Sequence, residues 1–73
     1  MPIDLRTTFA ANVVRLRRAK SFSQAALAYE AGVNRSYLAG RHYVGLEAIG
    51  KLAEALEVEP TELLKLPSRR ATS

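Results

Sequence analysis

The sequence predicts an all-α domain, and three observations support this fold class. Apolar residues recur at helical spacing in separate stretches of the chain. Residues suited to cap a helix precede those stretches. No stretch gives a strand signal of alternating apolar and polar residues. At 73 residues without a cysteine, the chain should form one domain with a small core and no disulfide framework.

The first predicted helix runs from Leu5 to about Lys20. Asp4 can cap it, because its carboxylate accepts from free N–H groups and suits the positive end of the helix dipole. One face of the helix is apolar and consists of Leu5, Phe9, Val13 and Leu16. The last turns are basic, and they compensate the dipole, contact phosphates, or do both: Arg15, Arg17, Arg18 and Lys20.

The stretch Ser23–Leu38 contains two short predicted helices joined by a turn. Ser23 is a good N-cap for the first helix, and Gly32 suits the left-handed residue that follows its end. Asn34 is a second N-cap, and the turn after it is polar. A helix, a glycine turn and a second helix with a polar start form the helix-turn-helix layout. In that layout the second helix lies in the major groove of DNA.

Gln24 is the first residue inside the first helix of this motif. At that position a side-chain amide, beside free backbone N–H groups, can hold a phosphate oxygen. The alternative is an ordinary surface glutamine, which the local sequence alone favours.

The remainder of the chain predicts a loop, two more helices and a tail. Residues 39–45 form a loop by composition. The strongest amphipathic pattern predicts a helix from Gly45 to Glu57, with an apolar face of Leu46, Ile49, Leu52, Ala53 and Leu56. Pro60 and Glu62 mark the start of a short fifth helix that ends before Pro67. We therefore expect one helix-turn-helix domain over residues 1–67, with the motif at 23–40 and a flexible tail at 68–73.

Positive charge is concentrated in the N-terminal part of the chain. Residues 1–45 hold seven basic and two acidic residues, a net charge of +5, whereas residues 46–73 hold four and five, a net charge of −1. The positive charge thus accompanies the two-helix motif. It is typical both of a surface that binds a polyanion and of a solvated basic helix face.

Several classes of function have no support in the sequence. It lacks a glycine-rich phosphate loop, a paired-carboxylate cluster and a Ser/His/Asp set, so we expect neither an enzyme nor a cofactor. His42 is the only histidine, and it predicts no metal site without further ligands at helical spacing. Because the sequence shows no long apolar run and no signal-peptide pattern, we expect a cytoplasmic protein without membrane contact.

One long part of the chain carries a family resemblance. It covers about Phe9 to Leu66 and reads VVRLRRAKSFSQAALAYEAGVNRSYLAG, followed by GLEAIGKLAEALEVEPTELLKL. The combination of SQ, LA and AGV at fixed offsets with the helix LEAIGKLAEALEV is specific. It resembles the Cro/repressor-type helix-turn-helix family, also called XRE or lambda-repressor-like DNA-binding domains. The size is similar to that of the small controller proteins of restriction–modification systems.

The resemblance implies a compact five-helix domain that regulates transcription. Members of the family bind the major groove of double-stranded operator DNA as two-fold symmetric dimers, so we expect a homodimer on a palindromic operator. No small-molecule ligand is evident. The glutamine of the SQ pair, Gln24, matches a position that contacts phosphate. The base-reading positions match Asn34, Arg35, Ser36 and Tyr37.

The DNA-binding residues differ in their expected roles. We expect Arg35 to read a base, because a guanidinium pairs bidentately with guanine O6 and N7, and a phosphate clamp is its alternative role. For Asn34, capping is favoured over reading adenine, and Ser36 can do either. Tyr37 contacts either the DNA backbone or a thymine methyl group. Arg41 belongs to the basic part of the chain and is counted with the DNA-binding residues.

The segment after the second motif helix departs from the family. Relatives continue with a stretch such as I-E-x-G, whereas here Gly40 is soon followed by Gly45 and a few residues are missing by comparison. The missing glutamate commonly pairs with a first-helix arginine, here Arg17, which is then expected to contact phosphate. Three explanations are open: a short loop, an early end of the recognition helix, or residues absent from the sequence.

The last predicted helix is the expected contact between two copies of the chain. By the resemblance, Leu63 and Leu66 belong to this dimer interface, and the alternative is that they close the core of the monomer. A second class of function fits the same sequence. The domain would then be a protein-interaction module, such as an antitoxin-like partner, that uses the acidic residues 46–66 to bind a second protein.

Overall fold

The computed structural model describes residues 4–38 and 44–66. They form α1 (Leu5–Ala19), α2 (Gln24–Ala31), α3 (Arg35–Leu38), α4 (Leu46–Leu56) and one 3-10 helix, η1 (Pro60–Leu63). Because these residues contain no strand, the all-α prediction is confirmed for them. The predicted fifth helix is a 3-10 turn rather than an α-helix, so the count of five α-helices is not confirmed. The predicted tail at residues 68–73 lies outside the described residues.

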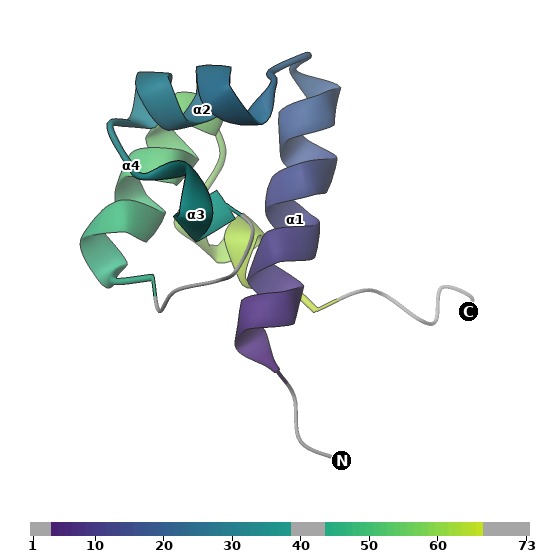
Figure 1. The fold of residues 1–73 in the computed structure, drawn as a ribbon. Helices are drawn as coiled ribbons and strands as arrows, with labels where there is room; N and C mark the ends of the chain where they lie inside the picture. The colour runs from purple at the N-terminus through teal and green to yellow at the C-terminus, as the bar shows by residue number, and fades with distance from the viewer. Residues whose placement is uncertain (1–3, 39–43, 67–73) are drawn as a thin grey trace.

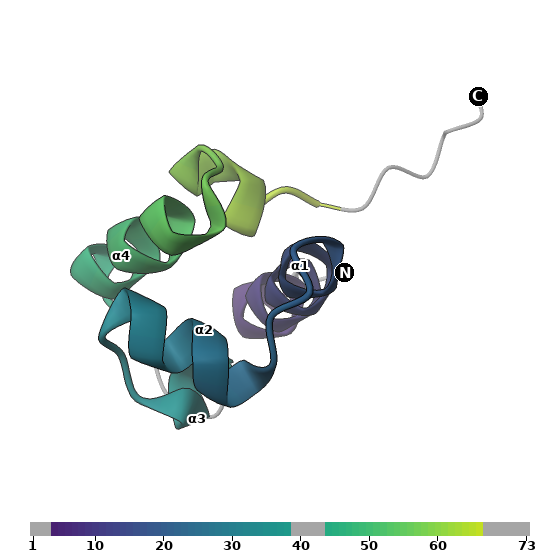
Figure 2. The same cartoon turned by 90° about the horizontal axis from the view of Figure 1, so that it is seen from above.

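The helices are arranged around a single centre. Figure 1 shows α1 along one side of the molecule, with α2 crossing near its C-terminal end. Helix α2 packs against α4, and η1 contacts both α4 and α1. In the view from above, α3 and η1 lie on opposite sides of the molecule (Figure 2). No helix among the residues described is long and apolar enough to cross a membrane.

Every described helix contributes side chains to one hydrophobic core. Helix α1 supplies two large side chains, α3 supplies Leu38, and η1 supplies Leu63, which is completely buried. The core thus depends on η1 as well as on the longer helices. Its members are Phe9, Val13, Leu27, Ala28, Ala31, Leu38, Ile49, Leu52, Ala53, Leu56 and Leu63.

Two leucines that the helical spacing placed on apolar faces are exposed instead. Leu5 is 54% exposed and Leu46 is 85% exposed. Each is the first residue of its helix. Side chains in a helix lean toward its N-terminus, so a first-turn side chain points past the end of the helix rather than onto its packing partner. The periodicity was therefore right for the helices and wrong for these two side chains.

The predicted helix caps are confirmed. Asp4 Oδ1 accepts from the backbone N–H of Arg6 at 3.1 Å, and Ser23 Oγ accepts from that of Ala26 at 3.0 Å. The pKa of the Asp4 carboxyl is lowered from its ordinary value by this hydrogen bond and by one from the Thr7 hydroxyl. Gly45 precedes α4 as its N-cap and provides no side-chain hydrogen bond. The two side-chain caps help to fix where α1 and α2 begin.

An exposed ion pair joins the C-terminal ends of α1 and α4. Lys20 Nζ lies 2.7 Å from Glu57 Oε1. This hydrogen bond and the charge of the ammonium group lower the pKa of the Glu57 carboxyl from its ordinary 4.5. A carboxylate with a lowered pKa stabilises the fold above its ordinary pKa, and the contribution disappears as the pH falls through the lowered value. The contribution is small because the Glu57 side chain is 75% exposed.

Replacing Gly32 with alanine is expected to lower the free energy of unfolding by about 1–2 kcal/mol, because Gly32 has a φ of +71° and a side chain strains the left-handed backbone. Gly50→Ala is the matched control, since Gly50 lies inside α4 and should gain up to about 1 kcal/mol of helix propensity. An added Cβ meets nothing within 4 Å at either position. Urea denaturation measures both changes, and equal effects would show that the turn conformation is not the cause.

Candidate nucleic-acid interface

The two helices of the predicted motif are held together by their buried sides. Helices α2 and α3 contact each other, and the turn at Gly32 joins them (Figure 1). Leu27 of α2 and Leu38 of α3 are both buried in the core. Helix α3 is only four residues long over Arg35–Leu38, and its first residue is exposed. The start of α3 is therefore presented to solvent on a fixed support.

Asn34 caps α3. Its Oδ1 accepts from the backbone N–H of Ser36 at 2.9 Å and from the Ser36 hydroxyl at 2.8 Å. An asparagine reads adenine through both its amide oxygen and its amide nitrogen. Because the oxygen already has two donors, the geometry supports the capping role of Asn34. The Ser36 hydroxyl donates its hydrogen to Asn34, so toward DNA this hydroxyl can act only as a hydrogen-bond acceptor.

Arg35 and Tyr37 lie on either side of Ser36. Arg35 is exposed and has no hydrogen bond or ion pair to any other residue in the described part of the chain. Tyr37 is half-buried, and its backbone N–H donates to the carbonyl of Asn34 at 3.0 Å. Its side chain lines a shallow pocket together with Val33 and Lys51. Of the four predicted base-reading residues, Arg35 has the side chain that is most free to reach a ligand.

A second predicted contact region lies where α1 leads into α2. Gln24 is the first residue of α2 and is half-buried, beside the backbone N–H groups at the start of that helix. Arg17 Nη1 donates to the carbonyl of Phe22 at 2.8 Å. Phe22 precedes the N-cap, Ser23, so this bond places the Arg17 guanidinium close to the start of α2. The structure thus brings Arg17 and the region of Gln24 together.

The backbone carbonyl of Phe22 accepts a hydrogen bond from Arg17, whose expected glutamate partner is missing from this sequence. It satisfies only one part of the guanidinium, because the buried Nε atom of Arg17 has no hydrogen-bond partner. A buried donor without a partner is costly in free energy. Among the described residues, no carboxylate forms an ion pair with Arg17.

The basic residues of α1 are not equally available for DNA. Arg15 Nη2 donates to Asn12 Oδ1 at 3.2 Å, and Lys20 is paired with Glu57. Arg18 is exposed in the last turn. Arg41 lies outside the described residues, together with the other residues of the predicted loop from 39 to 43, and α3 is described over Arg35–Leu38.

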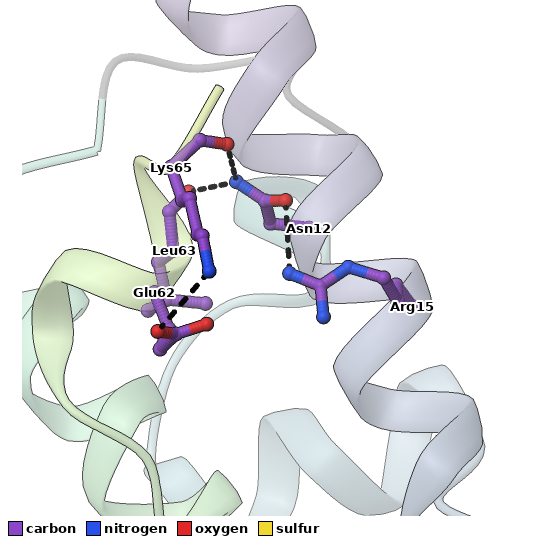
Figure 3. A network of polar contacts seen from close by, with 5 residues as sticks. All are labelled: Asn12, Arg15, Glu62, Leu63 and Lys65. Carbon is purple, nitrogen blue, oxygen red and sulfur yellow. Dashed lines mark hydrogen bonds and ion pairs between the residues drawn. The ribbon is translucent and has the colours of Figure 1, made fainter. Parts of the chain in front are cut away.

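Asn12 has a structural role that is not among the sequence-based predictions. It is 8% exposed, the one buried polar residue in the described part of the chain. Its Nδ2 donates to the carbonyls of Leu63 and Lys65, both at 2.9 Å (Figure 3). A signal was present, because Asn12 lies three residues after Phe9 and thus on the apolar face of α1.

The fold and the exposed start of α3 define a helix-turn-helix DNA-binding protein. No protein-family model matches the chain. The control protein C.BamHI of Bacillus amyloliquefaciens is 36% identical over 69 residues, which cover 88% of this chain and 85% of the relative. The crystal structure of the restriction–modification controller protein C.AhdI from Aeromonas hydrophila is 42% identical with a TM-score of 0.73, covering 80% of this chain and 94% of that one.

A further solved structure supports the same assignment. It is the crystal structure of a hypothetical transcription factor, NHTF, from Neisseria, which is 35% identical with a TM-score of 0.84, covering 97% of this chain and 88% of that one. The chain belongs to the family of restriction–modification controller proteins, which are helix-turn-helix regulators of the XRE or Cro-like type. It is accordingly a DNA-binding transcription regulator, as the sequence resemblance indicated.

Proposed function

We propose that this protein binds a palindromic operator as a homodimer and controls transcription by occupying it. The DNA-binding unit comprises residues 1–67, with α3 in the major groove. The observation that carries this proposal is the exposed guanidinium of Arg35 at the start of α3, which has no polar partner among the residues described. A guanidinium in that position can donate two hydrogen bonds to guanine O6 and N7.

The region between α1 and α2 supplies the contacts to the DNA backbone. Gln24 and the N-terminus of α2 offer donors to one phosphate, and the guanidinium of Arg17 lies near them through its bond to the Phe22 carbonyl. Contacts of this kind set position and affinity without carrying sequence information. The division of roles is therefore between Arg35 for the bases and Gln24 with Arg17 for the phosphates. Tyr37 and Arg41 are further proposed DNA contacts.

Replacing Gln24 with alanine should weaken binding to operator and to random DNA by the same factor, because the phosphate contact is independent of sequence. A hydrogen bond to a charged group contributes about 1.5–3 kcal/mol. Thr61→Ala is a matched control, since Thr61 is exposed on η1, opposite α3. Fluorescence anisotropy with both DNAs measures the effect, and a loss confined to the operator would contradict the phosphate role.

The proposed dimer contact lies on the side of η1. Leu66 is 48% exposed, and we retain it as a residue of the proposed interface. Leu63 is completely buried, so its side chain closes the monomer core, the alternative considered for it. Two further exposed leucines, Leu5 and Leu64, line one groove between α1 and the segment after η1. Because η1 and α3 lie on opposite sides (Figure 2), a contact here leaves α3 uncovered.

A DNA titration at two salt concentrations tests the proposed function against the protein-interaction alternative. If each dimer neutralises several phosphates, the affinity should fall by about 10³-fold or more between 50 and 200 mM salt. Binding of random DNA should fall along with it. An absence of binding to any DNA at low salt would overturn the proposal and favour a protein partner for residues 46–66.

A further inference from the structure

The amide of Asn12 is used completely within the molecule. Its nitrogen donates both hydrogens, one to the carbonyl of Leu63 and one to that of Lys65, each at 2.9 Å. Its oxygen accepts from Arg15 Nη2 at 3.2 Å. Figure 3 shows the Asn12 side chain reaching from α1 to the end of η1 and the segment beyond it. A residue in the middle of α1 thus holds backbone groups more than 50 positions later in the chain.

The segment Leu64–Leu66, which follows η1, has few other polar attachments. The backbone N–H of Leu64 donates to the carbonyl of Thr61 at 3.1 Å and ends the 3-10 turn. Lys65 forms an exposed ion pair with Glu62 at 3.9 Å, which lies within the same region of the chain. Among the hydrogen bonds of the described residues, the one from Asn12 to Lys65 alone ties this segment to a different helix, and the other bond from Asn12 holds Leu63 just before it.

This segment presents the apolar surface assigned to the dimer. Leu64 is 39% exposed and Leu66 is 48% exposed. Leu64 lines a groove of about 510 Å³ on one side of α1, and Leu66 lines another of about 550 Å³ on the other side together with Asn12. Neither leucine lies in a regular helix. Their position relative to α1 therefore depends on what fixes the backbone of the segment.

We propose that Asn12 is a positioning residue for the dimer interface, which it acts on by fixing the segment Leu64–Leu66 against α1. This inference rests on the proposed homodimer and adds that the second copy docks on a surface prepared by Asn12. Fixing the segment before association removes part of the ordering cost that would otherwise weaken the dimer. Asn12 itself does not need to touch the second copy.

An asparagine suits this role better than its close neighbours in size. Two hydrogens on one nitrogen match two carbonyl acceptors, and no other short side chain offers both from one atom with an acceptor beside it. An aspartate has the same shape but no donor, so its oxygens would face the two carbonyl oxygens. An alanine would leave both carbonyls without their partner and the segment without its tie to α1.

The test is the dimer dissociation constant of Asn12→Ala, measured by sedimentation equilibrium on the full chain at a temperature where circular dichroism shows it folded. We expect a rise of about tenfold or more over the wild type, corresponding to about 1.4 kcal/mol. Asn12→Asp is the second variant, and it should raise the constant at least as much. Ala28→Gly in α2 is the control, because it weakens the fold in a helix on the side away from η1.

The outcomes separate the inference from the proposal on which it rests. A dimer with a micromolar dissociation constant is mostly formed at about 100 μM. If the wild-type chain stays monomeric at that concentration, the homodimer is overturned and the role of Asn12 with it. If the wild type dimerises and both Asn12 variants dimerise equally well, only the positioning role is overturned. If Ala28→Gly weakens the dimer as much as Asn12→Ala, general stability is responsible and the positioning role is overturned.

A double variant distinguishes positioning from direct contact. If Asn12 acts through Leu66, then Asn12→Ala should weaken the dimer far less in a Leu66→Ala background than in the wild type. Additive effects of the two substitutions would contradict action through Leu66. Backbone ¹⁵N relaxation gives an independent measurement, because loss of the tie should increase fast motion at Lys65 and Leu66 and leave α2 unchanged.

Discussion

Replacing Arg35 with alanine is expected to reduce the free energy of operator binding by about 1–3 kcal/mol and to relax the choice of base at one position of each half-site. The reason is the bidentate geometry that a guanidinium offers to guanine. The side chain is exposed at the first position of α3, and the residues on either side do not restrain it by a polar contact. Competition between operator and random DNA measures the change in specificity.

Arg35→Lys is the control that separates base reading from charge. Lysine keeps the positive charge but lacks the planar fork of donors, so the two roles of Arg35 predict different results. For a base reader, the lysine variant should keep its affinity for random DNA and lose discrimination. A phosphate clamp would instead show the wild-type ratio of operator to random binding in both variants, which would contradict the assignment.

Replacing Leu52 with alanine should produce the largest loss of stability, about 2–5 kcal/mol. Leu52 is completely buried at the centre of α4 and packs in the core that α2 and η1 share with it. A domain of this size has a total stability of about 4–11 kcal/mol, so the variant should be close to unfolding at ambient temperature. Urea denaturation with circular dichroism measures the change.

Leu46→Ala is the matched control for this prediction. It makes the same substitution in the same helix, but Leu46 is 85% exposed. Surface substitutions usually change stability by no more than about 0.5 kcal/mol. Equal losses at Leu46 and Leu52 would contradict the assignment of the core, because alanine is the better helix former and propensity alone produces no loss at either position.

Features of the chain that depend on neighbouring residues could be predicted from the sequence. Ser23 and Asn34 each cap a helix through an N–H group two or three residues away. Gly32 adopts the left-handed conformation that the residue after a helix often takes, and its identity as a glycine is visible in the local sequence. The order of α1 to α4 follows from such local signals together with helical periodicity. The predicted function depended in addition on the family resemblance.

Features that depend on distant residues could not be predicted in the same way. The exposure of Leu5 and Leu46 depends on where the packing partner of each helix ends. The role of Asn12 depends on carbonyls more than 50 residues away. Periodicity predicts on which face of a helix a residue lies, but it does not predict which residues of other elements contact that face.

The 3-10 turn of η1 illustrates the same limit. Pro60 and Glu62 are good signals for the start of a helix, and the turn does begin at Pro60. Leu63, the last residue of η1, is completely buried in the core, and its carbonyl accepts a hydrogen bond from Asn12. Both contacts are made with α1 and α4 rather than within residues 60–66. A local pattern therefore predicted a start at this position but not the kind of helix that follows.

Selection of bound sequences from a random DNA pool tests most directly whether α3 reads a two-fold symmetric operator. The wild-type chain should enrich an inverted repeat whose half-sites lie about 10 bp apart, one turn of the duplex. The Arg35→Lys variant, run in parallel, should lose one guanine from each half-site. A pool without an enriched motif, a single unpaired half-site, or the same motif for both proteins would contradict this account.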